Sequence, residues 1–193
     1  KSVVNIDQPL SGITVMIDAG HGSEDSGAIG PLGTYYSEKN INLANSMRLR
    51  SQLQEYGAEV IMTREGDTKF SLTEVLNQSR KEKPDMFISL HANSMANNVD
   101  ISKISGFSTY YREEIAKDIS YKIQNNVISK LGREDKKIHN NNFYVTRGTW
   151  APSILLEAGF VPNPLEFEWL VNDEKQKELV KVIADSLVDY YSK

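Results

Sequence analysis

The chain has 193 residues, of which 39% are hydrophobic and 25% are charged, an ordinary composition for a globular protein. No run approaches the roughly 18 apolar residues of a transmembrane helix, so no membrane span is expected. The formal net charge of -4 argues, though weakly, against a nucleic-acid partner. Because the chain has no cysteine, disulfides and thiolate ligands are excluded, and a zinc site would have to use histidine and carboxylate side chains.

The length is sufficient for one domain with a full hydrophobic core, and we expect a single domain over residues 1–193. Residues 1–11 are interpreted as a lead-in segment. This segment is polar up to Pro9 and lacks the apolar stretch of a signal peptide. We therefore expect either a cytosolic protein or a mature domain cut from a longer precursor.

In the first half of the chain, short apolar runs alternate with helical patterns. The predicted elements are a strand over 13–17, a glycine-rich loop over 23–36, a helix from Ser37 to Gly57, a strand over 58–62, a helix from a capping box at Ser71 and Glu74 to about Lys83, and a strand over 86–90. The buried stripe expected on the first helix is Ile41, Leu43, Ala44, Met47, Leu49 and Leu53. This alternation of strand and helix, with nearly continuous apolar strands, predicts a largely parallel sheet.

The second half continues the same pattern. The predicted elements are a polar loop over 95–105, a strand over 106–111, an amphipathic helix over 113–131, a short strand over 143–146, a strand over 153–159, and closing helices over 165–171 and 173–191. We predict an α/β fold with a twisted, mostly parallel but mixed sheet of about six strands and helices on both faces.

Four polar side chains occupy positions that the predicted sheet would bring together. His21 and His91 follow predicted strands, Glu157 ends another, and Glu38 lies in the first turn of a helix. In a parallel sheet the carboxyl ends of the strands lie along one edge, where ligands bind. Each residue also has an ordinary structural interpretation: a turn or capping histidine, a glutamate favoured by the helix dipole, or a solvated strand end. The case for function therefore depends on their shared position.

Two neutral imidazoles and one carboxylate form a common catalytic zinc site, in which a fourth position is left for water. We therefore expect His21, Glu38 and His91 to hold zinc, and Glu157 to act as the general base. The third histidine, His139, has no apolar strand before it and is followed by three asparagines. It is interpreted as a loop residue that could face substrate, and not as a ligand.

Four motifs in this order resemble a known family. Ile17-Asp-Ala-Gly-His-Gly22, Ser37-Glu-Lys-Asn40, Ser89-Leu-His-Ala-Asn93 and Leu155-Leu-Glu-Ala-Gly-Phe160 are similar to the zinc-dependent N-acetylmuramoyl-L-alanine amidases (amidase-3 group) of bacterial cell walls. Thr63-Arg64 and Pro152–Glu157 also match the family pattern, and the resemblance extends from about Ile13 to Tyr191.

The resemblance implies one zinc ion on His21, Glu38 and His91, with Glu157 as the catalytic carboxylate. The implied reaction is hydrolysis of the amide between N-acetylmuramic acid and L-alanine of the peptidoglycan stem peptide. Because this substrate is the wall, the resemblance also implies export, to the extracellular space or the cell wall.

Some relatives carry a helical insertion that blocks the site until an activator binds. The polar segment over 95–105 is too short for such an insertion, so we expect an open site with no obligatory activator. Asn93 and Arg147 are hypothesised to contact substrate. An ordinary surface role for Arg147 is an equal alternative.

Two other functions are compatible with the sequence. One is another zinc hydrolase on a similar sheet, such as a carboxypeptidase or a carbohydrate deacetylase. The other is a catalytically inactive wall-binding domain, although such a domain would not need the complete set of His21, Glu38, His91 and Glu157.

Overall fold

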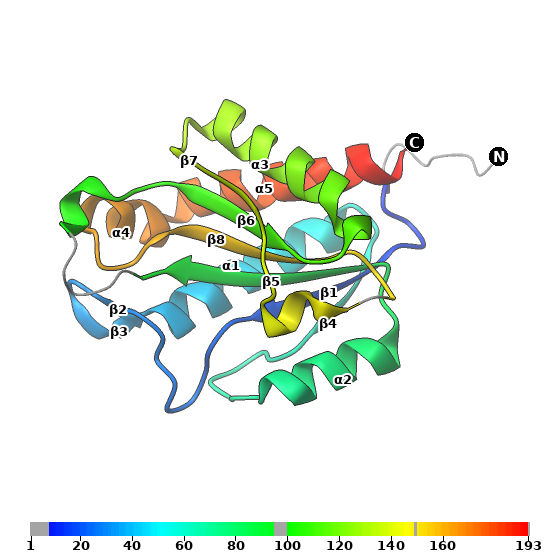
Figure 1. Ribbon diagram of the computed structural model, residues 1–193, viewed down its shortest axis with the longest axis horizontal. Coiled ribbons are helices and arrows are strands. Elements are labelled where there is room, and N and C mark those ends of the chain that lie inside the picture. The colour runs from blue at the N-terminus through cyan, green and yellow to red at the C-terminus, as the bar shows by residue number, and fades with distance from the viewer. Residues whose placement is uncertain (1–7, 95–99, 149, 193) are drawn as a thin grey trace.

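One six-stranded sheet organises the chain in the computed structural model, which describes residues 8–94, 100–148 and 150–192 (Figure 1). The strand order is β4-β1-β5-β8-β6-β7, and every neighbouring pair is parallel except β6 and β8. The strands are β1 (Thr14–Ala19), β4 (Glu59–Met62), β5 (Met86–Asn93), β6 (Phe107–Tyr111), β7 (Asp135–Asn140) and β8 (Ser153–Phe160). The predicted mixed, mostly parallel α/β fold is therefore confirmed.

Helices cover the two faces of this sheet unequally. They are α1 (Glu38–Glu55), α2 (Leu72–Glu82), α3 (Lys117–Leu131), α4 (Pro164–Val171) and α5 (Asp173–Tyr191). Side chains of α1, α3 and α5 join the larger core on one face. On the other face a smaller core forms from Met16, Val75, Phe87, Val145 and Leu155, under α2 and a 3-10 turn over Tyr144–Arg147. The second face is thus only partly covered.

Strand alternation places the candidate site on this partly covered face. Because successive side chains of a strand point to opposite faces, His91 shares the face of Phe87 on β5. Glu157 likewise shares the face of Leu155 on β8. The strands β5 and β8 are parallel neighbours in which His91 pairs with Glu157 in register. The site therefore lies near the carboxyl ends of these strands, beside the small core.

Three local predictions are wrong. The stretch 143–146, expected to be a strand, lies almost entirely in the 3-10 turn Tyr144–Arg147, although its aromatic and β-branched residues are typical of strands. Strand β7 was not predicted, because the polar sequence of Asp135–Asn140 lacks an apolar alternation. The predicted loop over 23–36 contains an antiparallel pair, β2 (Ile29–Gly30) and β3 (Gly33–Ser37).

Helix α1 also buries a face that differs from the predicted apolar stripe. Ile41, Leu49 and Leu53 are buried as expected, whereas Ala44 is exposed. Asn42, Asn45 and Ser46 complete the buried face of the helix. Of these three, Asn42 lies against the site, where its amide donates to Glu38.

The second half of the chain differs in one smaller respect. The helix predicted over 113–131 begins only at Lys117, after a 3-10 turn over Glu114–Ala116.

A buried ion pair ties α4 to the segment that follows α3. The Nη2 of Arg133 lies 2.6 Å from Oε2 of Glu166, and the Arg133 guanidinium packs over the ring of Trp169. The same Glu166 oxygen accepts hydrogen bonds from the backbone N–H groups of Gly106 and Phe160. One carboxylate thus fixes the ends of β6 and β8 together.

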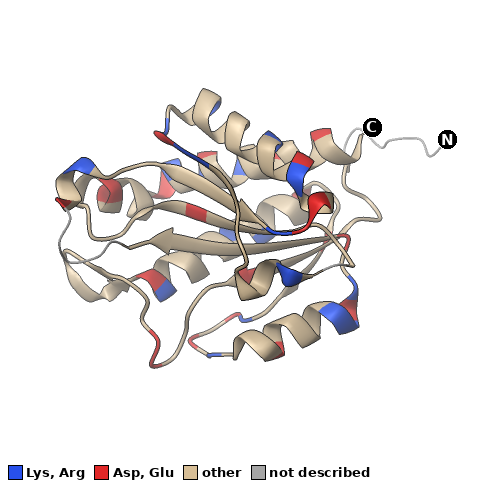
Figure 2. Cartoon of the chain, viewed as in Figure 1, with Lys and Arg blue, Asp and Glu red and all other residues tan. Residues whose placement is uncertain are grey.

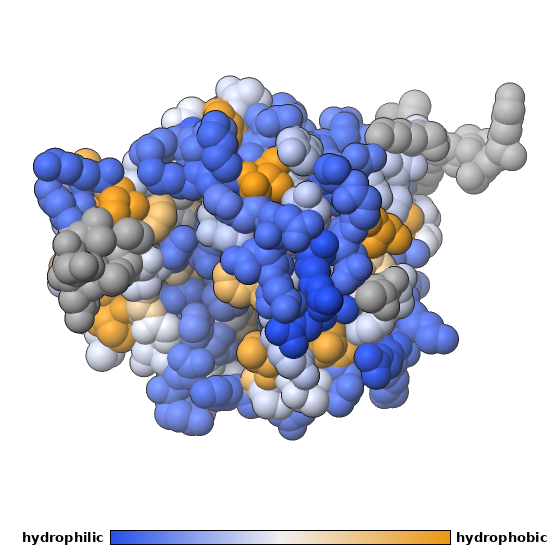
Figure 3. Space-filling model, viewed as in Figure 1, coloured by the Kyte–Doolittle hydropathy of each residue, from blue (hydrophilic) through white to orange (hydrophobic). Residues whose placement is uncertain are grey.

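Charged side chains are spread over the helices and loops, with both signs interspersed (Figure 2). The face seen in Figure 3 is mainly hydrophilic, with small separate apolar patches. In the described part of the chain, no helix is long and apolar enough to cross a membrane.

Candidate metal centre and active site

Three side chains from separate elements converge at the end of the sheet. His21 follows β1, Glu38 begins α1, and His91 lies on β5. The Nε2 of His21 and the Nδ1 of His91 each lie 3.0 Å from the same Glu38 oxygen, Oε1. One ligand atom from each residue lies within 4.8 Å of the other two. This spacing suits a group that could hold a metal ion.

Glu38 is held in place from several directions. Its Oε2 accepts a hydrogen bond from the backbone N–H of Ala28, and its Oε1 accepts from the N–H of Ala92 and the Nδ2 of Asn42. The same Asn42 amide donates to the carbonyl of Gly20. These bonds explain why α1 buries a polar residue one turn after Glu38.

Two glycines make room for the converging side chains. A Cβ at Gly20 would overlap the imidazole ring of His91. At Gly27, where φ is +62°, a Cβ would lie 2.5 Å from Oε2 of Glu38. Side chains at either position would displace a candidate ligand.

Asp25, which was not singled out from the sequence, orients the first histidine. Its Oδ1 lies 3.0 Å from Nδ1 of His21 and also accepts a hydrogen bond from the N–H of Gly27. Because a carboxylate only accepts, Nδ1 of His21 carries the proton and Nε2 is left to face the cluster. A carboxylate behind a metal-bound histidine is a common arrangement. In the sequence, the position of Asp25 four residues after His21 is the signal that could have identified it.

The charges of the cluster are strongly coupled. Burial favours neutral Glu38, but hydrogen bonds from His21 and His91 outweigh it and hold the pKa of Glu38 well below its usual range. Burial lowers the pKa of His91, but Glu38 and the negative charges of Glu157 and Asp18 outweigh it and raise this pKa to about 9. The pKa of His21 is also raised, because the bond to Glu38 outweighs burial. In the metal-free protein, the imidazole protons therefore bond His21 and His91 to the Glu38 carboxylate.

Glu157 lies beside the cluster and is not one of the three candidate metal ligands. Burial, aided by the negative charge of Glu38, raises the pKa of Glu157 to about 7, against the opposing effect of His91 and His21. Its Oε2 is buried and has no hydrogen-bond partner among the residues that the structure describes. A carboxylate of this kind can take up and release a proton near neutral pH.

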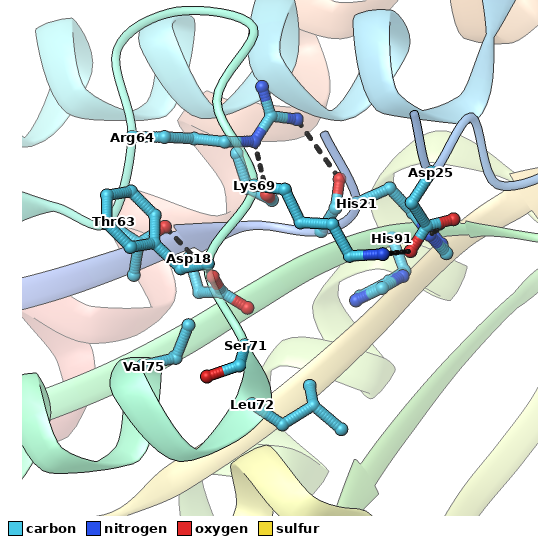
Figure 4. A pocket seen from close by; sticks show the side chains of 13 residues that line it. Asp18, His21, Asp25, Thr63, Arg64, Lys69, Ser71, Leu72, Val75 and His91 are labelled. Atoms are coloured by element: carbon cyan, nitrogen blue, oxygen red, sulfur yellow. Dashed lines mark hydrogen bonds and ion pairs between the residues drawn. The ribbon is translucent and has the colours of Figure 1, made fainter. Parts of the chain in front are cut away.

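A buried polar network supports the loop that carries His21. The Oδ1 of Asp18 accepts a hydrogen bond from Thr63, and its Oδ2 accepts one from Ser89. The buried guanidinium of Arg64 donates to the carbonyls of Ala19, Gly20, Gly66 and Lys39. Arg64 thus joins the end of β1 to the start of α1, which gives the Thr63-Arg64 motif a structural role (Figure 4).

Two pockets flank the cluster and share His21, Leu72 and His91. One, of about 380 Å³, is bordered by charged side chains that include Asp25 and Lys69 (Figure 4). The other, of about 260 Å³, contains Glu38 and Glu157 and is lined by Asn93, Ser94, Phe143, Tyr144, Val145 and Leu155. A substrate crossing the cluster would meet a charged side and a more apolar side.

The other sequence-predicted residues lie at different distances from this site. Asn93 lines the smaller pocket, with its Oδ1 accepting a hydrogen bond from the N–H of Ser94. Arg147 is not among the lining residues; its guanidinium donates to Asn142 and packs over the ring of Tyr144. His139 lies on β7 instead of in a loop, with its ring stacked on Tyr110.

The segment expected to leave the site open lies partly outside the described residues. Residues 95–99 are not described, and residues 101–103 form a 3-10 turn.

The donor set of the cluster fits a zinc ion. Two imidazole nitrogens and one carboxylate oxygen are borderline-to-hard ligands of the kind that zinc accepts, and cysteine is absent from the chain. The two nitrogens face a common point beside a carboxylate that is already ionised. Loss of the two imidazole protons would leave these three atoms free to bind a cation.

The chain matches one protein family along most of its length. The family model described as N-acetylmuramoyl-L-alanine amidase (Amidase_3) matches residues 15–189. The uncharacterized protein YqiI of Bacillus subtilis is 35% identical over 188 residues, which are 95% of this chain and 87% of that protein. The N-acetylmuramoyl-L-alanine amidase LytC of the same organism is 31% identical over 191 residues, which cover 99% of this chain but only 38% of LytC.

Solved structures are similar over nearly their whole length. The catalytic domain of the N-acetylmuramoyl-L-alanine amidase CwlV from Bacillus (Paenibacillus) polymyxa var. colistinus has a TM-score of 0.85 and 33% identity, covering 93% of this chain and 98% of that one. An N-acetylmuramoyl-L-alanine amidase from Clostridium difficile 630 has a TM-score of 0.87 and 29% identity, covering 94% and 97%.

Proposed function

This chain belongs to the Amidase_3 family of N-acetylmuramoyl-L-alanine amidases, which cleave peptidoglycan, and we propose that it does so with one zinc ion held by His21, Glu38 and His91. The bond cut is the amide between N-acetylmuramic acid and L-alanine of the stem peptide. The observation that carries this proposal is the convergence of three ligand atoms within 4.8 Å of one another, in a pocket that also contains Glu157.

Glu157 is the general base and then the general acid of the proposed reaction. Zinc supplies Lewis acidity to the site. Glu157 takes a proton from the water whose oxygen attacks the carbonyl carbon, and it returns that proton to the alanine nitrogen as the C–N bond breaks. A pKa of about 7 suits both steps, because the carboxylate exists in both states near neutral pH. Asp25 positions the imidazole of His21 throughout.

Substrate access and location follow from the same proposal. Because the polar segment over 95–105 is too short in sequence for a blocking helical insertion, no activator is required to release the site. Asn93 in the smaller pocket and Arg147 beyond it contact the substrate, so alanine at either position raises KM. Because peptidoglycan is the substrate, the enzyme acts at the cell wall.

Product analysis with the zinc-loaded protein tests the proposal. An amidase creates new L-alanine amino termini on purified cell wall. A carboxypeptidase would instead release a terminal amino acid, and a deacetylase would release acetate. New alanine termini support the proposal, whereas either other product, or none, refutes it.

Two glutamate variants then test the role of Glu157. Glu157→Gln should lower kcat by about 10²–10⁴-fold, the range for one general acid–base group, while metal content is kept. Glu168→Gln, on the exposed side of α4, is the matched control and should act like the wild type. Unchanged turnover in Glu157→Gln would remove this residue from the mechanism.

A further inference from the structure

Three aromatic rings form a row that leads away from the active site. The ring of Phe143 packs edge-to-face against Tyr110 at a centroid distance of 5.0 Å. The imidazole of His139 is stacked on Tyr110 at a centroid distance of 4.9 Å, with an interplanar angle of 23°. We call these three residues the aromatic row. No part of the metal site or of the proposed proton transfer uses them.

The aromatic row begins at the pocket that contains Glu157. Phe143 lines that pocket together with Leu155 and Glu157. Tyr110 on β6 pairs in register with Leu155 on β8, so its side chain lies on the same face of the sheet. His139 on β7 pairs in turn with Tyr110. The row therefore crosses from the pocket wall to the edge strand of the sheet.

This row is open to solvent at both ends. Phe143 is 37% exposed, His139 is exposed, and Tyr110 is partly buried between them. Strand β7 is the last strand of the sheet, and Figure 1 shows the segment after it crossing in front of the sheet toward the yellow turn. A hydrophobic core would hide such rings, whereas a binding surface exposes them.

The two sides of the metal cluster differ in a way that assigns the substrate. The larger pocket carries charged side chains, with Lys69 Nζ 3.6 Å from Oδ2 of Asp25. A stem peptide has charged groups, but a sugar ring of the glycan is uncharged. Its C–H face is apolar and packs on aromatic rings, while its hydroxyl and N-acetyl groups stay hydrated. The aromatic side therefore suits the sugar, and the charged side suits the peptide.

We propose that Phe143, Tyr110 and His139 form a saccharide subsite that binds a ring of the glycan strand next to the muramic acid whose amide is cut. This inference rests on the proposed amidase function. The subsite makes the enzyme select glycan-linked peptides over free muramyl peptides. It also fixes the direction in which the glycan strand lies across the metal site.

Kinetics with two substrates that differ only in glycan length test the subsite. One substrate is a muramyl tripeptide with a single sugar, and the other carries the same peptide on a tetrasaccharide. His139→Ala, at the end of the row away from the Glu157 pocket, should raise KM for the longer substrate by about three- to tenfold, the size of one aromatic contact, with kcat retained. The KM for the one-sugar substrate should change much less. Tyr121→Ala, 49% exposed on α3 at the other face, is the control and should change neither.

A structural role would give a different result. If His139→Ala merely disturbed the site, kcat/KM for both substrates would fall by the same factor, and this outcome would overturn the proposal. An effect that followed a cross-linked second stem peptide instead of glycan length would also overturn it. Thermal unfolding of each variant checks that the fold is retained.

A binding measurement separates this inference from the amidase function. Triacetylchitotriose, a glycan with no peptide, is titrated into the metal-free protein while the aromatic proton resonances are followed by NMR. Shifts at Tyr110, Phe143 and His139 support the subsite even if the loaded protein cleaves nothing. Shifts elsewhere, or none at millimolar sugar, contradict it even if the amidase activity is confirmed.

Discussion

Metal binding by this protein should release protons, and the size of the effect follows from the cluster. At pH 7 His91, with a pKa of about 9, is almost fully protonated in the metal-free protein. A histidine must lose its proton before it can bind a metal. Because pH 7 lies about two pH units below the pKa of His91, removing this proton at pH 7 costs about 2.7 kcal/mol. Zinc affinity at pH 7 should therefore be about 100-fold weaker than well above pH 9.

The sign of this effect is fixed by the direction of the shift. Because the pKa of His91 is raised, the proton competes with the metal most strongly at low pH, and affinity rises by at least about tenfold per unit between pH 7 and 8. The raised pKa of His21 adds to the slope at lower pH. Glu157, with a pKa of about 7, also loses protons when a cation is near, so the Glu157→Gln variant isolates the histidine contribution.

Calorimetric zinc titrations of Glu157→Gln in two buffers of different ionisation enthalpy measure this directly. The difference between the apparent enthalpies gives the number of protons released, and we expect about one or more at pH 7. Release of far less than one proton, with an affinity that does not change between pH 7 and 8, would show that the metal does not displace the proton of His91.

Three further outcomes are expected. Gly20→Ala should lower zinc affinity, measured by chelator competition, because its Cβ would overlap the ring of His91; Gly66→Ala, with nothing within 4 Å of its Cβ, is the matched control, and equal affinities would contradict the steric argument. Asp25→Ala should weaken zinc binding by about 10- to 100-fold through loss of the hydrogen bond that orients its histidine, and an unchanged affinity would leave Asp25 without that role. Glu166→Ala should lower the free energy of unfolding in urea by about 3–5 kcal/mol because it leaves a buried arginine unpaired, and a loss below 1 kcal/mol would contradict this.

The sheet was predictable because its central strands are apolar runs that end in polar residues. The stretch 13–17 and the stretch 86–90 have this form, and the structure extends them by two and three residues, respectively, toward the site. The shared sheet edge then brings His21, Glu38 and His91 together, as their positions after strands and at a helix start indicated. Long-range convergence was thus inferred from local patterns alone.

Elements at the edge of the sheet were not predictable in the same way. Strand β7 is stabilised by pairing with β6, and its Asp-Lys-Lys-Ile-His-Asn sequence gives no sign of this partner. The residues 143–146 have strand-forming side chains, yet Val145 packs into the small core from a 3-10 turn. In both cases tertiary contacts override the local preference.

Supporting residues were missed because their roles depend on geometry that no single motif contains. Asp25 accepts a hydrogen bond from His21, which lies four residues earlier in the same loop. Asn42 donates to Glu38 from a buried position that the predicted apolar stripe did not include. Arg64 was noted as part of a family pattern, but its four carbonyl partners come from three segments. Only the folded chain shows that these side chains hold the candidate ligands in place.

The most direct test of the account is anomalous diffraction at the zinc edge from crystals of the zinc-loaded protein. We expect one strong peak within about 2.0–2.2 Å of Nε2 of His21, Nδ1 of His91 and a carboxylate oxygen of Glu38. Crystals of the Glu38→Ala variant, prepared with zinc in the same way, should show no peak at this position. A peak bound elsewhere on the chain, or one that persists unchanged in the variant, would contradict the assignment of these three residues as the metal site.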